Sequence, residues 1–221
     1  MGFLKKIMTT NYFITATDTS AGKTYIATKL IKHFIAQNCR VAGFKPLASG
    51  CDITSVGLRN DDALQLQSAA NINLSYETIN PLAFRPAIAP HIAAQKANVT
   101  LSVESIHQAM QPALNLSYDI GVVEGAGGWL LPLNETETLA DWVVAENFQV
   151  VLVVPIRLGC LNHALLTYQS ILNSSASFTG WIANCLEPDL PFVDENIQTL
   201  KQWIKAPCLG VVANETSLLS I

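Results

Sequence analysis

One stretch of the sequence decides the fold: Ala16-Thr17-Asp18-Thr19-Ser20-Ala21-Gly22-Lys23-Thr24. It follows an apolar run at Tyr12–Ala16 and opens an amphipathic stretch at Lys23–Gln37. A loop between a buried strand and a helix can cradle a phosphate, because the backbone N–H groups and the dipole at the helix N-terminus favour an anion. Lys23 would reach the outer phosphates and Thr24 would offer its hydroxyl to Mg²⁺. The strict phosphate-loop pattern has glycine where this chain has Thr17.

Short apolar runs alternate with longer amphipathic stretches along the rest of the chain. The runs are rich in Val and Ile without polar alternation, which is typical of a parallel sheet covered on both faces. We predict strands at Tyr12–Ala16, Val41–Phe44, Ile120–Glu124, Val150–Ile156, Thr179–Asn184 and Cys208–Val212. We predict helices at Lys23–Gln37, Asp61–Ala70, Val103–Leu114, Leu139–Asn147, Asn162–Leu172 and Val193–Ile204. The pattern predicts an α/β protein with the three-layer P-loop NTPase fold, in which helices cover both faces of a mostly parallel central sheet.

The 221 residues fit a single domain spanning 1–221, without repeats or linkers. Residues 1–7 precede the first strand and could form a dispensable, disordered extension. The least regular part is Asn71–Asn98, which contains Pro81, Pro86 and Pro90. Irregular connections often carry function, although this one could equally be a plain surface crossover.

The composition excludes several classes of protein. Half of the residues are apolar and 14% are charged, which argues against disorder. The net charge of −4 argues against a nucleic-acid binder, and no apolar run approaches the roughly 20 residues of a membrane-spanning helix. Five scattered cysteines form no CxxC pair, so we expect a cytoplasmic protein without a disulfide framework. Residues 1–60 hold eight Lys/Arg against two Asp/Glu, a net charge of +6 that would suit an anion site.

Further charged residues follow the other predicted strands. Lys45 comes directly after the second strand, and the carboxyl ends of parallel strands face one crevice, so Lys45 and Lys23 would meet around a polyanion. Asp61 and Asp62 open a helix, where acids are often only caps, but one of the two could hold Mg²⁺. Glu124 ends an apolar strand and precedes a glycine-rich turn, Gly125–Gly128, that lets backbone approach a ligand closely. Together these residues predict an NTP·Mg²⁺ site with Thr24, Asp62 and Glu124 as metal ligands.

Taken together, the motifs resemble the dethiobiotin synthetase family of biotin synthesis. The matching pieces appear in family order and cover residues 12 to about 185. They are ATDTSAGKT (16–24), GFKPLASG (43–50), GLRNDDALQLQ (57–67), INPLAF (79–84), PHIAA (90–94), VVEGAGGWLLPL (122–133), ADWV (140–143), LGCLNHALLT (158–167) and GWIAN (180–184).

The resemblance implies an ATP- and Mg²⁺-dependent reaction of 7,8-diaminononanoate with CO₂ that gives dethiobiotin, ADP and phosphate. It implies a carbamate and then a carbamic-phosphoric anhydride as intermediates. It also implies a homodimer with the active site at the interface, where the N–H groups of Gly159, Cys160, Leu161 and Asn162 would bind the carboxylate tail of a substrate held mainly by the other subunit.

The resemblance also assigns roles within the site. Lys45 takes the position of the catalytic lysine, Lys23 neutralises charge, and Thr19 bonds the reacting group. Ser49 would contact the substrate, and Asn184 would read the adenine edge. The full set of expected nucleotide-binding residues is Ser20, Ala21, Gly22, Lys23, Thr24, Tyr25, Asp62, Glu124, Gly125, Ala126, Gly127, Asn184 and Cys185.

Two alternative interpretations remain at the level of sequence. A ParA/MinD-like ATPase switch usually carries a second lysine early in the loop, where this chain has Thr17 and Asp18. A nucleotide-binding paralogue without catalytic activity is suggested by Ser20, which replaces a common glutamate, and by Cys185, which replaces a common aspartate. The family's loop glycine is also replaced, by Ala16. The retained Lys23 and Lys45 favour the enzyme.

Overall fold

The structure is a computed structural model that describes residues 9–185, 191–214, 216–217 and 219–221. The predicted extension at residues 1–7 lies outside this part of the chain. Within it, a central sheet has the strand order β10-β9-β8-β1-β7-β2, and every pairing is parallel. The strands are β1 (Thr10–Ala16), β2 (Val41–Phe44), β7 (Ile120–Glu124), β8 (Gln149–Pro155), β9 (Ser177–Asn184) and β10 (Cys208–Val212).

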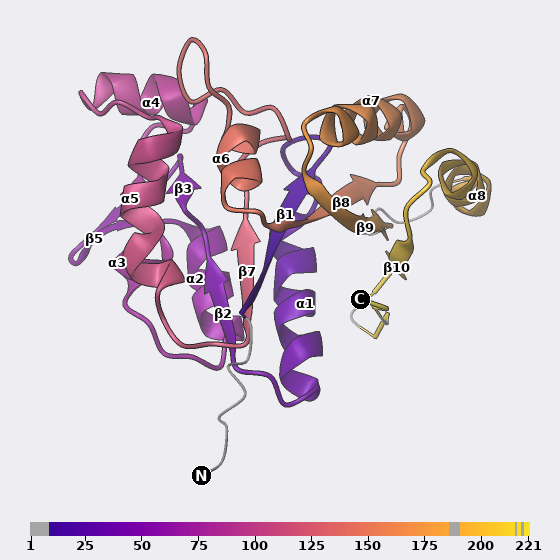
Figure 1. Ribbon diagram of the computed structural model, residues 1–221, viewed down its shortest axis with the longest axis horizontal. Helices are drawn as coiled ribbons and strands as arrows, with labels where there is room; N and C mark the ends of the chain where they lie inside the picture. The colour runs from indigo at the N-terminus through magenta and orange to yellow at the C-terminus, as the bar shows by residue number, and fades with distance from the viewer. Residues whose placement is uncertain (1–8, 186–190, 215, 218) are drawn as a thin grey trace.

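Helices cover both faces of this sheet. They are α1 (Lys23–Ala36), α2 (Asp61–Ala69), α3 (Tyr76–Ile79), α4 (Pro90–Lys96), α5 (Val103–Leu114), α6 (Leu139–Ala145), α7 (Cys160–Asn173) and α8 (Val193–Trp203). Buried side chains of α1 and α2 form one core with Ile14 and Val122, whereas those of α5 to α8 form a second core with Phe13 and Val123. Figure 1 shows the sheet running from β2 to β10, with α1 on one side and α7 on the other. The predicted three-layer fold is confirmed.

Successive residues of one strand point to opposite faces of the sheet, and here both faces are covered. Phe13 and Ile14 of β1 therefore lie in different cores. In β8, the run from Val150 to Val154 is completely buried for the same reason. This double burial accounts for much of the high apolar fraction of the chain. No helix within the described residues is long and apolar enough to cross a lipid bilayer.

The strand order places a ligand crevice beside β1. The chain first builds β2 and β7 on one side of β1 and later adds β8, β9 and β10 on the other. In open α/β sheets, ligands bind at the carboxyl ends of the strands where the order reverses in this way. The segments after β1, β2 and β7 therefore converge at one end of the sheet.

The predicted elements differ from the structure mainly at their ends. Helix α6 ends at Ala145 rather than at the predicted Asn147, which has a positive φ of 53°. Helix α7 begins at Cys160, two residues before the predicted start, because Gly159 (φ 89°) forms its N-cap. Ala16, which replaces the family's loop glycine, lies within β1 opposite Val153 and does not have a positive φ, so this replacement introduces no backbone strain.

Several short elements are too small for hydrophobic periodicity to reveal. Two residue pairs form the parallel ladder of β3 (Leu47–Ala48) with β6 (Leu82–Ala83). A small antiparallel hairpin consists of β4 (Asp52–Thr54) and β5 (Gly57–Arg59). The irregular stretch at Asn71–Asn98 contains α3, β6 and α4. The β3–β6 ladder joins this stretch to the segment that follows Lys45.

Candidate active site

The phosphate loop enters α1 through a left-handed glycine. Gly22 has a φ of 84°, which side chains with a Cβ disfavour. A Cβ at Gly22 would also lie 2.1 Å from Nδ2 of Asn184, which donates a hydrogen bond to the Ala21 carbonyl at 2.8 Å. Ser20 also has a positive φ, 59°, which is unfavourable for a residue that carries a Cβ. The end of β9 thus packs directly against the loop that opens α1.

Lys23 bridges the two glycine-containing loops. Its Nζ donates to the carbonyl of Asp18 at 3.2 Å and to that of Gly127 at 2.6 Å. Burial, and then the nearby charge of Lys45, lowers the pKa of Lys23 to about 8. A buried cation with a lowered pKa is stabilised by an anion, so a bound phosphate would favour the charged form of Lys23.

Lys45 lies at the centre of the site and contacts two carboxylates. Its Nζ is 2.7 Å from Oδ2 of Asp62 and 2.7 Å from Oε1 of Glu124, and it donates to the Gly125 carbonyl at 3.3 Å. Burial disfavours the charged amine, but Glu124 and Asp62 outweigh burial and hold the pKa of Lys45 above its ordinary value. The same pairing lowers the pKa of Asp62 against the effect of its own burial. Lys45 is therefore charged at neutral pH.

Glu124 has one oxygen in use and one without a partner. Oε1 accepts from Thr24 Oγ1 at 2.9 Å and from Lys45, whereas Oε2 is buried without a hydrogen bond from any described residue. Burial raises the pKa of this carboxyl group above its ordinary value. A buried acceptor without a hydrogen-bond donor costs free energy. A ligand that brings a cation or a donor group to Oε2 would remove this cost.

Mg²⁺ fits the residues around this oxygen. Thr24, Asp62 and Glu124 offer one hydroxyl and two carboxylates, and hard oxygen ligands suit this ion. The described residues contain no group of three or more His, Cys, Asp or Glu able to hold a metal by themselves. Mg²⁺ usually keeps several water ligands and binds substrate phosphates, so a site with two carboxylates matches its coordination preferences.

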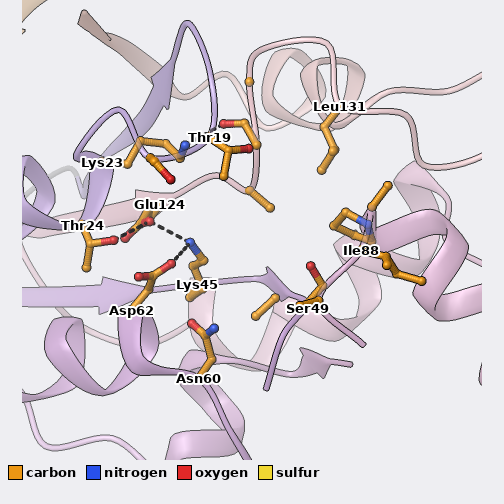
Figure 2. A pocket seen from close by; sticks show the side chains of 18 of the residues that line it. Thr19, Lys23, Thr24, Lys45, Ser49, Asn60, Asp62, Ile88, Glu124 and Leu131 are labelled. Atoms are coloured by element: carbon orange, nitrogen blue, oxygen red, sulfur yellow. Dashed lines mark hydrogen bonds and ion pairs between the residues drawn. The ribbon is translucent and has the colours of Figure 1, made fainter. Parts of the chain in front are cut away.

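A cavity of about 830 Å³ opens over these side chains (Figure 2). Most of the predicted site residues line it: Thr19, Ser20, Gly22, Lys23, Thr24, Lys45, Ser49, Asp62, Glu124, Ala126 and Gly127. Figure 2 shows Thr24, Asp62 and Lys45 grouped around Glu124, with Ser49 and Ile88 further along the wall. One end of the cavity is thus charged and the other is more apolar.

Other predicted residues lie outside this cavity. Asn184 contacts the phosphate loop through its bond to the Ala21 carbonyl, and its Oδ1 is buried without a partner among the described residues. Tyr25 lines a separate groove of about 350 Å³ along α1. The backbone N–H of Cys185 donates to the Val212 carbonyl at 2.7 Å, and Gly125 packs so closely on Phe13 that a Cβ would lie 2.7 Å from that ring.

The segment Gly159–Asn162 also contributes nothing to the cavity of its own chain. The N–H of Cys160 donates to the Arg157 carbonyl at 3.0 Å, so one of the predicted donors already has a partner. Leu158, just before it, is fully exposed. The assignment of this segment to a second subunit's substrate stays a prediction.

Sequence reasoning missed part of the cavity wall. Asn60, Ala48, Ala87, Ile88, Ala89, Pro90, Leu130, Leu131 and Pro132 also line the cavity, next to Gly128 of the predicted glycine-rich turn. The residues from Ala87 to Pro90 belong to the irregular stretch, whose three prolines were the sequence feature that indicated an irregular connection there. The irregular connection therefore forms part of the site rather than a plain surface crossover.

A parallel sheet whose central strand leads through a phosphate loop into α1 is the arrangement of the P-loop NTPases, and the chain has that fold. A family model described as "AAA domain" matches residues 10–220. The chain belongs to the family of ATP-dependent dethiobiotin synthetases, as similarity over nearly its whole length shows.

Two relatives illustrate this similarity. The ATP-dependent dethiobiotin synthetase BioD of Aeromonas salmonicida is 44% identical over 205 residues, which are 93% of this chain and 91% of the relative. The protein of that name from Pseudomonas aeruginosa strain UCBPP-PA14 is 47% identical over 201 residues, or 91% of this chain and 88% of the relative.

A solved structure shows the same fold at lower sequence identity. The septum site-determining protein MinD of Pyrococcus horikoshii OT3, complexed with Mg-ADP, superposes with a TM-score of 0.59 at 15% identity. The match covers 93% of this chain and 82% of MinD. At this identity the likeness establishes the fold alone.

Proposed function

We propose that this protein uses ATP to carboxylate 7,8-diaminononanoate and close it to dethiobiotin, releasing ADP and phosphate. The observation that carries the proposal is Lys45, a buried cation between Asp62 and Glu124 that faces the same cavity as the phosphate-loop lysine Lys23. Two cations at one cavity suit a reaction in which two anions must meet. Membership of the family supplies the identity of those anions, a carbamate and a nucleoside triphosphate.

In the proposed reaction, one amine of the substrate adds to CO₂, loses a proton and becomes a carbamate. A carbamate oxygen attacks the γ-phosphorus of ATP, which forms a carbamic-phosphoric anhydride and releases ADP. The second amine attacks the carbonyl carbon and loses a proton, phosphate leaves, and the cyclic urea is complete. The protein's task is to hold two like-charged groups in line and to neutralise charge that develops between them.

Lys45 and Lys23 divide that task. Lys45 uses its three N–H groups on Asp62, Glu124 and the Gly125 carbonyl, and the last bond is the longest at 3.3 Å. That bond is the one we expect Lys45 to exchange for a substrate oxygen. Lys23 would exchange its backbone partners for the outer phosphates. Thr19 and Ser49 line the same cavity, where Thr19 would bond the reacting group and Ser49 would contact the substrate.

Two further proposals concern the nucleotide. Mg²⁺, held by Thr24, Asp62 and Glu124, would neutralise phosphate charge when it is bound. Asn184 presents a buried Oδ1 without a partner among the described residues, and this acceptor suits the amino group of adenine.

We also propose that the protein acts as a cytoplasmic homodimer with the active site at the interface. Leu158 and Leu166 are exposed on either side of the Gly159–Asn162 segment and the start of α7. Exposed apolar side chains beside an expected interface support burial against a second copy. Sedimentation velocity would test the dimer, and a monomer at assay concentration would contradict it. All five cysteines are free thiols, as expected in a reducing compartment.

The proposed activity is tested by incubating the protein with MgATP, bicarbonate and 7,8-diaminononanoate and analysing the products by mass spectrometry. We expect dethiobiotin only when all three substrates are present. Hydrolysis of ATP that is independent of the diamine, without dethiobiotin, would contradict the proposal and favour an ATPase switch.

A further inference from the structure

The short helix α3 is hydrogen-bonded to the Lys45 backbone and to Asn60, the N-cap residue of the helix that carries Asp62. Tyr76 is the first residue of α3, and Asn80 is its C-cap residue and part of the INPLAF motif. Neither residue lines the cavity. Asn80 is a buried polar residue, 3% exposed, and Tyr76 is 7% exposed. Buried polar groups need partners, so the partners of these two side chains show what they hold in place.

Lys45 has both of its main-chain polar groups bonded to the end of α3. Its N–H donates to the Ile79 carbonyl at 2.9 Å, and its carbonyl accepts from Nδ2 of Asn80 at 2.6 Å. Pro46 follows Lys45 and restricts its backbone further. The bonds to α3 therefore fix the backbone of Lys45 just after the end of β2, and with it the direction of the Lys45 side chain.

The same helix holds the start of α2, which carries Asp62. The hydroxyl of Tyr76 donates to Oδ1 of Asn80 at 2.9 Å and accepts from the backbone N–H of Asn60 at 2.7 Å. Asn60 is the N-cap of α2, and its side chain accepts from the N–H of Ala63 at 3.2 Å. The guanidinium of Arg59 also lies over the Tyr76 ring, 4.1 Å from its centroid.

These bonds close a ring. It runs from the Lys45 backbone through Asn80 and Tyr76 to Asn60, then along the first turn of α2 to Asp62, and back to Nζ of Lys45 at 2.7 Å. We propose that Tyr76 and Asn80 are positioning residues for the reaction: through this ring they set the distance between the Lys45 ammonium and the Asp62 carboxylate. This inference rests on the proposed function and adds to it a pair of side chains that touch neither substrate nor nucleotide.

The test is Tyr76→Phe, which removes only the hydroxyl. Tyr118 offers a matched control, because it is also a buried tyrosine (3% exposed) whose hydroxyl donates to an asparagine, Oδ1 of Asn11 at 3.1 Å. Tyr118 precedes β7 and so lies at the amino end of the strand, opposite the site. The Tyr76 hydroxyl makes two hydrogen bonds and the Tyr118 hydroxyl makes one, so thermal unfolding should show a loss of stability in both variants and the larger loss in Tyr76→Phe.

Steady-state kinetics and crystal structures of the two variants then separate positioning from stability. We expect kcat for dethiobiotin formation to fall about tenfold in Tyr76→Phe, while its KM for ATP changes by less than about twofold, because the phosphate loop is untouched. Tyr118→Phe should keep the wild-type kcat. Equal effects of the two substitutions on kcat, or a normal kcat in Tyr76→Phe, would overturn the proposal.

The crystal structures give a readout that does not depend on activity. We expect Nζ of Lys45 and Oδ2 of Asp62, 2.7 Å apart in the wild-type protein, to move beyond hydrogen-bond distance in Tyr76→Phe and to stay paired in Tyr118→Phe. An unchanged pair in Tyr76→Phe would overturn the positioning role whatever the activity. Wild-type protein that makes no dethiobiotin would instead refute the proposed function, and the Lys45–Asp62 distance would still decide the positioning role.

Discussion

Nζ of Lys45 and Oε1 of Glu124 lie 2.7 Å apart in the interior of the protein, where their side chains are 5% and 1% exposed. The sheet brings them together, because Phe44 of β2 pairs with Val123 of β7; Lys45 comes directly after the end of β2, and Glu124 is the last residue of β7. A buried pair of this kind leaves a costly isolated charge when one partner is removed. The proposed function and the stability of the protein therefore depend on the same two residues.

Lys45→Met is predicted to abolish dethiobiotin formation and also to destabilise the protein. The substitution keeps much of the side-chain volume but leaves the buried Glu124 carboxylate without its cation, which should lower the free energy of unfolding by about 3 kcal/mol. Activity assays and urea denaturation check the two effects. In Lys45→Met/Glu124→Gln the stability should largely return and the activity should not; recovery of both would contradict the role of Lys45.

Thr24→Val is predicted to weaken the effect of Mg²⁺ on nucleotide binding. The hydroxyl that now donates to Glu124 would be lost, whereas Thr24→Ser keeps it. Calorimetric titration of ADP with and without Mg²⁺ measures the effect, and we expect the gain in affinity from Mg²⁺ to shrink about tenfold in Thr24→Val, by the loss of one ligand. The same gain in Thr24→Val as in Thr24→Ser would argue against this hydroxyl as a ligand.

Gly22→Ala is predicted to lower the free energy of unfolding by roughly 1–3 kcal/mol, because the residue has a positive φ and its new Cβ would collide with Asn184. Gly128→Ala is the control, since a Cβ there meets its nearest atom at 3.6 Å, an ordinary contact. Chemical denaturation compares the two variants. Equal stability of both would show that the loop tolerates a side chain at Gly22.

His107 is predicted to make stability depend on pH through its contact with Glu146, which joins α5 to α6. The hydrogen bond that the protonated imidazole donates to Glu146, and then the charge of Glu146, raises the pKa of His107 above the ordinary 6.5. The stabilisation is therefore complete below pH 6.5 and is lost as the pH rises through the higher pKa of the folded state. Glu146→Gln should lower unfolding temperature at acidic pH and have less effect at alkaline pH; a constant difference would contradict this.

The fold could be predicted from sequence because its main signals are local and repeated. The strands at Val41–Phe44 and Ile120–Glu124 are continuous apolar runs, and the structure gives them the predicted bounds. The parallel topology then follows, since helices that separate such strands must cross over the sheet. By contrast, β3 and β6 have two residues each and form only by pairing with each other. Because the paired residues are more than 30 positions apart, no local pattern reveals them.

The candidate site could be predicted only in part, for a related physical reason. Lys23, Lys45 and Glu124 follow or open regular elements, so the shared edge of the sheet places them together. Tyr76 and Asn80 could not be found this way, because their importance depends on the fold of the Asn71–Asn98 connection and on bonds to Lys45 and Asn60. Asn80 lies in the INPLAF motif, but neither that motif nor Tyr76 indicates which residues the two side chains contact.

The Lys45 ammonium is proposed to serve a reaction that incorporates CO₂ into the diamine and is driven by ATP. The most direct measurement supplies [¹³C]bicarbonate, MgATP and 7,8-diaminononanoate and counts labelled dethiobiotin against phosphate released. We expect one labelled carbon and one phosphate for every dethiobiotin formed by the wild-type protein, and no labelled product with Lys45→Met/Glu124→Gln. Phosphate release without labelled dethiobiotin, or labelled product from the double variant at the wild-type rate, would contradict it.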